Sequence, residues 1–395
     1  MDRQTNAKPK EKIWTRDFVL IVLANFFIFL GFQMTLPTIP LFVEELGGND
    51  QLIGMVVGIF TFSALLLRPF AGHSLETKGR GFVYILGLAI FVLSVGSFGF
   101  LTSLVFLFII RIIQGVGWGF STTASGTIAT DLIPPTRRGE GMGYFGLSGN
   151  LALAFGPALG LILTDKLPFK PFFLICAGLG LVALLLSSKI HYKKVDKKQE
   201  KATIKRNLYE KSALKPSLLM FFLTVTFGGM AAFLPLYTAQ KHIAGIQLFF
   251  VLYAFALMVT RTFAGQLYDR KGHRAVFIPG TLLILTAMLL LSWLPNSLIL
   301  YTVACLYGLG FGTVQPALQA WSIEKVSINR RGMANATFFS FFDLGIGFGA
   351  ITFGQISHMF GYSSIYIASA ISVFLSMILY SVFLYKERGS AAQEG

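Results

Sequence analysis

The chain has 395 residues, of which 54% are hydrophobic and 13% are charged, and its mean hydropathy is +0.68. So large an apolar share excludes a chain that folds around one water-soluble core, and it indicates an integral membrane protein in a lipid bilayer. The formal net charge of +15 would suggest a nucleic-acid partner in a soluble protein, but here the charges are distributed as a topology signal, so we expect no nucleic-acid binding. The two cysteines, Cys176 and Cys305, lie inside apolar runs and predict neither a disulfide framework nor a metal site.

An amino-terminal tail, 1–17, precedes a long first apolar run that lacks a small-residue cleavage site, which favours a membrane span over a signal peptide. Nearly every later run also reaches the roughly 17 to 25 residues that a helix needs to cross the hydrocarbon core. Runs of this length favour helices over the short alternating strands of a barrel. The sequence therefore predicts an all-α polytopic membrane protein with twelve transmembrane helices, at about 18–43, 52–72, 82–100, 103–128, 141–164, 171–189, 216–239, 245–266, 275–294, 297–321, 334–357 and 362–385.

The stretch 190–215 separates the first six spans, 18–189, from the last six, 216–385. It is rich in lysine and too polar to cross a bilayer, so we expect a solvated linker. Of the 33 lysines and arginines, 27 fall in the tails, the linker and the connections on the same side, and three fall in the alternate connections. This asymmetry predicts that the linker and both termini, including a C-tail at 386–395, are cytoplasmic. The absence of disulfides and the minimal helical body suggest a bacterial inner membrane.

An internal repeat relates the two halves. The stretch Arg68-Pro-Phe-Ala-Gly returns 193 positions later as Arg261-Thr-Phe-Ala-Gly, and the same offset pairs Asn150 with Asp343. One offset that serves several stretches indicates a repeated unit. Because each unit has an even number of spans, the two six-helix bundles run the same way through the membrane and are related by a pseudo-two-fold axis along its normal. Such an arrangement predicts a substrate cavity near the midplane, between halves that rock against each other.

The connection after the second span resembles a signature of the major facilitator superfamily, Gly-x-Leu-Ala-Asp-Arg-x-Gly-Arg-Lys. The first half fits this pattern with Glu76 in place of the usual Asp, and the copy in the second half fits it better. The resemblance covers the whole chain and implies that these connections act as a conformational switch, because an acid at a helix end can pair with arginines in one state and release them in the other. The alternative is that they only determine topology. The residues assigned to the switch are Gly72, Glu76, Gly79, Arg80, Gly265, Asp269, Arg270, Gly272, Arg68 and Arg261.

The fourth span contains Arg111-Ile-Ile-Gln-Gly-Val-Gly, which resembles the span-4 motif of proton-coupled members of the superfamily. An arginine about seven residues from the end of a helix lies ~10 Å deep, which is costly in hydrocarbon unless the side chain faces a cavity or a partner. Its counterpart in the repeat is Ala304, so symmetry alone does not require it. The resemblance implies that Arg111 takes part in proton coupling or contacts an anionic substrate. The alternative is a structural anchor to backbone carbonyls.

The fifth span carries Gly143 and then Gly156-Pro157-Ala-Leu-Gly160, which resemble the antiporter motif of drug-efflux members. Two glycines of that motif are replaced, by Ala152 and Leu161. A Gly-Pro pair amid small residues kinks a helix and permits a neighbour to approach closely, as a gate would need. The resemblance therefore implies efflux, and the alternative is a packing kink of a kind that many membrane helices have.

Asp343 is the only carboxylate that lies well inside a predicted span. It is about nine residues from the end of its helix, ~13 Å deep, where a charged carboxylate is costly, so we expect it to carry the coupling proton. The alternatives are an acid that selects cationic substrates and an acid with a purely structural hydrogen bond. The polar residues that we expect to line the substrate cavity together with Asp343 are Gln33, Asn25, Gln114, Asn150, Tyr237, Gln315 and Gln319.

The resemblance implies a secondary active transporter that exports small organic molecules, such as drugs or a secreted metabolite, in exchange for protons. We expect a monomer that is driven by a proton gradient, without a cofactor and without enzymatic activity. A symporter that imports a sugar or another metabolite is the alternative within transport. A non-transporting receptor or scaffold is the alternative from another class. The five histidines show no metal-ligand spacing, and no nucleotide-binding or catalytic motif occurs.

Overall fold

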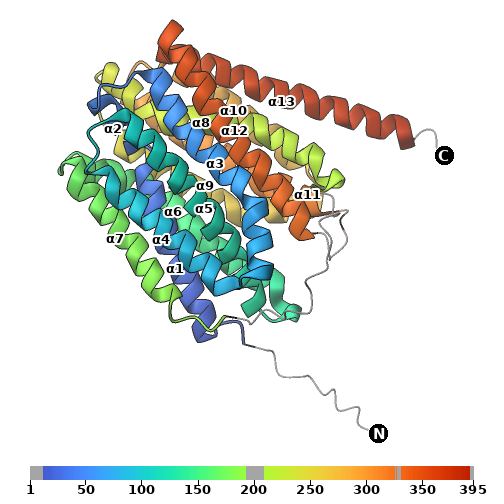
Figure 1. The fold of residues 1–395 in the computed structure, drawn as a ribbon. Helices are drawn as coiled ribbons and strands as arrows, with labels where there is room; N and C mark the ends of the chain where they lie inside the picture. Colours follow the sequence, from blue (N-terminus) through green and yellow to red (C-terminus); the bar gives the residue numbers. More distant parts are fainter. Residues whose placement is uncertain (1–11, 193–208, 325, 327–330, 392–395) are drawn as a thin grey trace.

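The computed structural model describes residues 12–192, 209–324, 326 and 331–391, and the regular elements of these residues are all helices. Long helices lie side by side and form one body (Figure 1). In chain order the elements are α1 (Arg16–Thr35), α2 (Thr38–Glu45), α3 (Asp50–Thr77), α4 (Arg80–Phe98), α5 (Leu104–Leu132), η1 (Pro135–Arg137), α6 (Arg138–Thr164), α7 (Phe169–Ser187), η3 (Lys211–Ala213), α8 (Leu214–Gln240), α9 (Ile246–Lys271), α10 (Arg274–Trp293), α11 (Ser297–Glu324), α12 (Arg331–Phe360) and α13 (Tyr362–Ala391).

Polar caps fix where several of these apolar helices begin. The Thr15 hydroxyl accepts a hydrogen bond from the Phe18 amide at 3.3 Å, and the Asn49 side chain accepts one from the Leu52 amide at 3.0 Å. Each cap satisfies one of the backbone N–H groups that the first turn of a helix leaves without a partner. The helices therefore begin at the polar edges of the apolar runs.

The expected first span, 18–43, is two helices rather than one. The chain breaks between α1 and α2 at Leu36 and Pro37, because a proline has no backbone N–H to continue the hydrogen-bond ladder of α1. At the other end of the chain, α13 continues beyond the expected boundary at 385 and ends at Ala391. Most of the predicted linker, 193–208, lies outside the described residues.

The helices of the two halves have the same neighbours. In the first half α1 packs against α6 and α7, α5 packs against α3 and α4, and α4 packs against α7. The same pairs recur in the second half, where α8 packs against α12 and α13, α11 packs against α9 and α10, and α10 packs against α13. The two most extensive contacts between the halves are those of α3 with α12 and of α6 with α9. We call these two contacts the α3–α12 seam and the α6–α9 seam.

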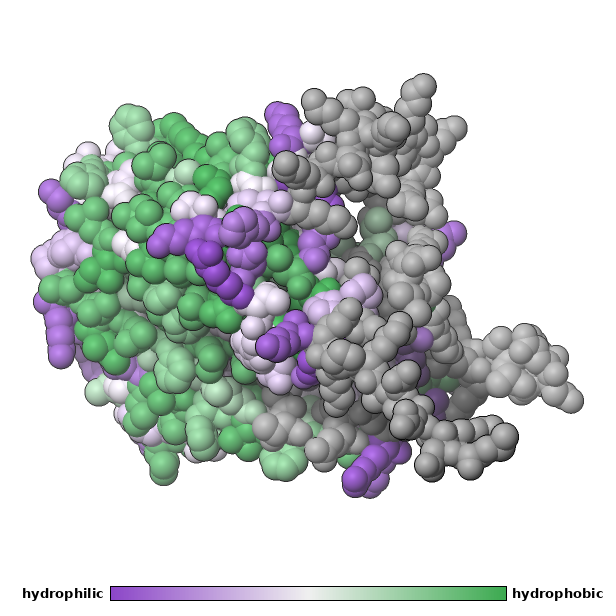
Figure 2. Space-filling model, turned by 90° about the horizontal axis from the view of Figure 1, so that it is seen from below, coloured by the Kyte–Doolittle hydropathy of each residue, from purple (hydrophilic) through white to green (hydrophobic). Residues whose placement is uncertain are grey.

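Eleven of the described helices are long and apolar enough to cross a membrane. The remaining expected span, 245–266, corresponds to α9, in which the described apolar stretch, Ile246–Thr260, is shorter than a span. On the face shown in Figure 2 most of the coloured surface is hydrophobic, and hydrophilic residues form smaller groups. The protein is therefore a multi-pass membrane protein, because this apolar outer surface needs a lipid surrounding.

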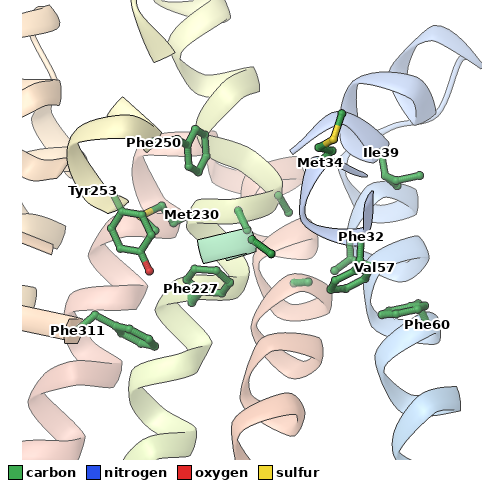
Figure 3. Close-up of a cluster of buried hydrophobic side chains, with 14 of the residues drawn as sticks. Phe32, Met34, Ile39, Val57, Phe60, Phe227, Met230, Phe250, Tyr253 and Phe311 are labelled. Carbon is green, nitrogen blue, oxygen red and sulfur yellow. The ribbon is translucent and has the colours of Figure 1, made fainter. Parts of the chain in front are cut away.

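One continuous hydrophobic core joins the two halves. Figure 3 shows part of it, with side chains from helices of the first half facing side chains from helices of the second. The labelled side chains are Phe32, Met34, Ile39, Val57 and Phe60 in the first half and Phe227, Met230, Phe250, Tyr253 and Phe311 in the second. The halves therefore meet through apolar packing as well as through the polar pairs described below.

Candidate functional site

A large cavity lies between the two halves. Its volume is about 2420 Å³, and its walls come from α1, α3, α5 and α6 on one side and from α8, α11 and α12 on the other. It extends to the connection between α3 and α4, where the exposed residues Thr77 and Lys78 line it, and to Tyr192 at the start of the predicted linker. We call this end of the molecule the linker end. The cavity is thus reached from one end of the helices.

At the opposite end, polar pairs join the halves. The Tyr362 hydroxyl donates a hydrogen bond to the Asp50 carboxylate at 2.8 Å, and the Gln51 amide donates one to Gln355 at 2.6 Å. At the other seam the Gln247 amide donates a hydrogen bond to Asp165. Together these pairs tie both seams at the end of the molecule that the cavity does not use.

An ion pair joins the halves across the α3–α12 seam. Nη2 of Arg68, on α3, lies 2.5 Å from Oδ2 of Asp343, on α12. Both side chains line the cavity, and about a quarter of each remains exposed, 23% and 26% respectively. The sequence assigned Arg68 to the switch and Asp343 to the proton site. The structure brings these two candidates into one ion pair.

Arg111 is buried in the wall of the same cavity, with 1% of its surface exposed. Its Nε donates to the backbone carbonyl of Val56 at 3.1 Å, and its Nη1 donates to Oε1 of Gln114 at 2.8 Å. Its guanidinium carbon lies 4.5 Å from the centre of the Phe60 ring, which adds a cation–π contact. These contacts include the backbone anchor that the structural alternative requires, while the position in the wall fits a role in the cavity.

Aromatic rings form the wall beside Arg111, a feature that the sequence-based predictions missed. The Phe32 ring stacks on Trp118 with centroids 4.1 Å apart and on Phe60 with centroids 5.2 Å apart. All three rings line the cavity. A signal was present in the sequence, because Trp118 is seven residues from Arg111 and so lies on the same face of a helix.

Most of the predicted polar residues also line the cavity. The Asn25 amide donates to the Ser148 hydroxyl at 2.9 Å, and the Gln319 amide donates to Asn335 at 3.3 Å. Gln33 is 9% exposed, and its Oε1 is buried without a hydrogen-bond partner. The predicted residues that line the cavity are Asn25, Gln33, Asn150, Gln315, Gln319 and Asp343.

Two predicted cavity residues lie elsewhere. Gln114 is fully buried beside Arg111 and is not among the described residues that line the cavity. Tyr237 is absent from that lining too, because it lies near the end of α8 opposite the linker, where its ring packs against Tyr366 and its hydroxyl lies 3.4 Å from the Ser363 hydroxyl. Both positions were assigned from polarity alone, which does not show the face of the helix on which a side chain lies.

Some residues of the predicted conformational switch are among those that the structure describes. Arg80, at the start of α4, donates from Nε to the Asp131 carboxylate of α5 at 3.1 Å and from Nη1 to the carbonyl of Leu75 at 2.9 Å. Gly79 and Gly272 have positive φ angles of 96° and 71°, which glycine adopts without strain. A methyl group placed on Gly72 would have no neighbouring atom within 4 Å, and Arg270 is exposed. The side chains of Glu76, Arg261 and Asp269, and the surroundings of Gly265, lie outside the described residues.

The span-5 residues pack α6 closely against α1. A methyl group on Gly156 would overlap Gln33, and one on Gly160 would overlap the Met34 carbonyl. Pro157 lies inside α6 between them, whereas Gly143 has open space around it. The two glycines therefore allow α6 to approach the end of α1 just before the break at Pro37.

Within the described residues, no group of three or more histidine, cysteine, aspartate or glutamate side chains could hold a metal ion.

The sequence model of the Major Facilitator Superfamily matches residues 21–326 and 241–394. The Staphylopine export protein of Staphylococcus aureus is 24% identical, over 86% of this chain and 89% of its own length. The Multidrug resistance protein MdtG of Citrobacter koseri is 26% identical, over 93% of this chain and 94% of its own length.

The fold agrees with these relationships. The structure matches the crystal structure of a bacterial homologue of the human lysosomal transporter Spinster, in an inward-facing and unoccupied conformation, with a TM-score of 0.75. That match covers 94% of this chain and 97% of the other at 14% sequence identity, so it supports the fold alone. The members of the matched family are transporters and not enzymes, and they need no cofactor. The chain belongs to the Major Facilitator Superfamily of membrane transporters.

Proposed function

We propose that this transporter exports small organic molecules in exchange for protons, by alternating access to the central cavity. The observation that carries this proposal is the Arg68–Asp343 ion pair, which lies in the cavity wall and ties one half to the other. An acid in this position can link protonation to conformation, because the same carboxylate holds the seam and lines the cavity through which the substrate would pass.

The coupling follows from the charge of Asp343. As a carboxylate it attracts the Arg68 guanidinium across the α3–α12 seam, and as a neutral acid it does not. Proton binding would therefore loosen this part of the seam, and proton release would restore it. The proton acts on one seam contact, and the substrate binds in the cavity. One pair of conformational states can therefore move the proton and the substrate in opposite directions.

Export is supported by two further observations. Two similar proteins have names that denote export of staphylopine and multidrug resistance. The glycines that resemble the antiporter motif, Gly156 and Gly160, also lie where a change in the approach of α6 to α1 would move a wall of the cavity. We therefore assign the direction as outward, with drugs or a secreted metabolite as cargo.

The topology that this mechanism needs is twelve spans in two six-helix bundles, with α9 as the eighth span. The linker end is assigned to the cytoplasm with both termini, in a bacterial inner membrane, so the cavity faces inward in this conformation. A single chain suffices, because both halves of the cavity come from the same polypeptide. The repeated helix neighbours and the excess of lysine and arginine at the linker end support this arrangement.

The test uses the purified protein in liposomes that contain a pH-sensitive dye, under an imposed proton gradient. Candidate cationic, zwitterionic and anionic compounds are added to the wild type, to Asp343→Asn and to Glu140→Gln. The last is a matched control, because Glu140 is an exposed acid that pairs with Arg137 outside the cavity. We expect substrate-driven proton movement in the wild type and the control, and none in Asp343→Asn. Substrate movement without protons, or normal coupling in Asp343→Asn, would refute the assignment.

A further inference from the structure

The charge of the cavity wall is unbalanced. Among the described residues that line it, four are arginine or lysine, and the only acid is Asp343. Lys78 and Arg80 lie at the linker end, where a molecule that enters from that side meets them first. A cavity with an excess of positive charge at its entrance attracts anions and repels cations. The four basic residues are Arg68, Lys78, Arg80 and Arg111.

Two of these cations are already paired with acids. Arg68 holds Asp343, so that this carboxylate does not offer an unpaired negative charge to a cationic substrate. Arg80 holds Asp131, which is not one of the described lining residues. The ion pair at Asp343 therefore argues against the alternative in which this acid selects cationic substrates.

Arg111 has a different set of partners. They are the Val56 carbonyl, the Gln114 amide oxygen and the Phe60 ring, and none of these carries a full negative charge. The Arg111 side chain is 1% exposed, and only dipoles stabilise its charge. A carboxylate, sulfonate or phosphate that arrives there would form a charge-assisted hydrogen bond with the guanidinium. The buried charge is costly without such a partner, which makes this position unusual for a purely structural residue.

The surroundings of Arg111 provide a surface for the rest of the ligand. The stacked rings of Phe32, Phe60 and Trp118 line the cavity beside the guanidinium, and flat apolar groups pack well on such rings. Gln33 follows Phe32 in the chain and also lines the cavity, with its buried Oε1 lacking a partner. An unpaired buried amide group is available to a polar substituent of a ligand.

We propose that the cavity selects amphipathic organic anions, which place a flat apolar body against Phe32, Phe60 and Trp118 and an acidic group at Arg111. This inference deepens the proposed function and rests on it for the direction of movement, but the binding preference itself does not require proton coupling. Zwitterions with an exposed acidic group fit the same site, whereas aromatic cations of equal size do not.

The test measures binding without any gradient. Equilibrium dialysis of the purified transporter in detergent compares three labelled probes that share one ring system and differ in charge: naphthoate, naphthylmethylammonium and naphthylmethanol. We expect naphthoate to bind at least about 10-fold more tightly than the ammonium compound, since one charge-assisted hydrogen bond provides about that factor. Equal affinities, a preference for the ammonium compound, or binding of none of the probes would overturn the inference.

Variants then identify the residue responsible. In Arg111→Gln the preference for naphthoate should disappear while the affinity for naphthylmethanol stays within about twofold, because the neutral probe has no charged group to pair with Arg111. Arg111→Lys should keep part of the preference. Arg16→Gln is the matched control, since Arg16 is exposed at the start of α1 and does not line the cavity. A naphthoate preference that survives in Arg111→Gln would overturn the assignment to Arg111.

This design separates the two hypotheses. A protein that binds naphthoate selectively but moves no protons in liposomes would refute proton coupling and leave the binding preference intact. A protein that moves protons in response to the ammonium compound and not to naphthoate would support proton-coupled transport and refute the preference for anions.

Discussion

The two seams between the halves occupy equivalent places in the repeat but differ in chemistry. At the α3–α12 seam Arg68 forms an ion pair with Asp343. The corresponding positions at the α6–α9 seam are Arg261 and Asn150, so a neutral amide replaces the acid there. An asparagine cannot gain or lose a proton in this way. The repeat therefore supplies the architecture twice and the titratable acid once.

The seams also differ at the end opposite the linker. A methyl group on Gly54 of α3 would overlap the Ala350 carbonyl and lie 3.2 Å from the Gly354 Cα atom, so two backbones approach closely there. The equivalents of Gly54 and Gly354 at the α6–α9 seam are Gln247 and Leu161, and Gln247 reaches Asp165 through its side chain. The α3–α12 seam thus combines close backbone packing with side-chain hydrogen bonds, whereas a longer side chain makes the contact at the equivalent position of the α6–α9 seam.

The largest effect is expected when the ion pair is broken. Arg68→Gln leaves Asp343 without its counter-charge, so we expect the rate of coupled transport to fall by about 10- to 100-fold. The exchanged variant, Arg68→Asp with Asp343→Arg, should recover part of the rate if the pair acts through mutual attraction. Proton movement in liposomes measures both, with Arg16→Gln as a control outside the cavity. An exchanged variant as inactive as Asp343→Arg alone would contradict an attractive pair.

Close packing at the α3–α12 seam gives the next largest effect. Gly54→Ala forces α3 and α12 apart at the end opposite the linker, and we expect it to favour the state that is open there by about 1–3 kcal/mol. A cysteine at Thr61, in a background without native cysteines, should then react faster with an impermeant maleimide added from that side. Gly178→Ala is the control, because no atom lies within 4 Å of a methyl group placed at Gly178. Equal labelling of the two variants would rule out the predicted role of Gly54.

An acid at the second seam should move the proton site. In Asp343→Asn the further change Asn150→Asp places a carboxylate at the repeat-related position, and we expect it to restore proton movement to about a tenth of the wild-type rate. Asn335→Asp is the matched control, since Asn335 also lines the cavity but has no such relation to Asp343. Equal recovery in both variants would mean that any acid in the cavity suffices.

The smallest effect concerns a single hydrogen bond. Tyr362→Phe removes the hydroxyl with which α13 donates to Asp50 of α3 beside the α3–α12 seam, and we expect it to weaken closure at this end by about 0.5–1.5 kcal/mol. The same maleimide assay should report labelling about two- to tenfold faster than in the wild type. Tyr385→Phe on α13 is the control, because Tyr385 is 81% exposed. Unchanged labelling in Tyr362→Phe would show that this hydrogen bond does not help to keep this end of the molecule closed.

Much of the architecture was predictable because membrane helices must be long and apolar. The runs and the 193-residue offset predicted the helices and their repeat, and Asn25, Gln33, Asn150, Gln315, Gln319 and Asp343 were predicted to line a cavity that the structure contains. The break at Pro37 was missed because an apolar run shows no gap where a proline interrupts hydrogen bonding.

The sequence limited the candidate partners of Asp343 but did not identify the partner. Arg68 and Asp343 belong to different halves, and an offset within the sequence relates equivalent positions without showing which helices cross between the halves. Three arginines lie within predicted spans or at their ends and were candidate partners of Asp343: Arg68, Arg111 and Arg261. Only the packing of α3 against α12 selects Arg68 among them.

The volume of the cavity, about 2420 Å³, exceeds the roughly 300–1,000 Å³ that is ordinary for a site that encloses one small molecule. Two different compounds can therefore occupy it together, one at the aromatic wall near Arg111 and another along α11 and α12 near Gln315 and Gln319. Inhibition of one cargo by another would then be mixed rather than purely competitive. A compound that fills the unused part of the cavity could slow transport without displacing the cargo.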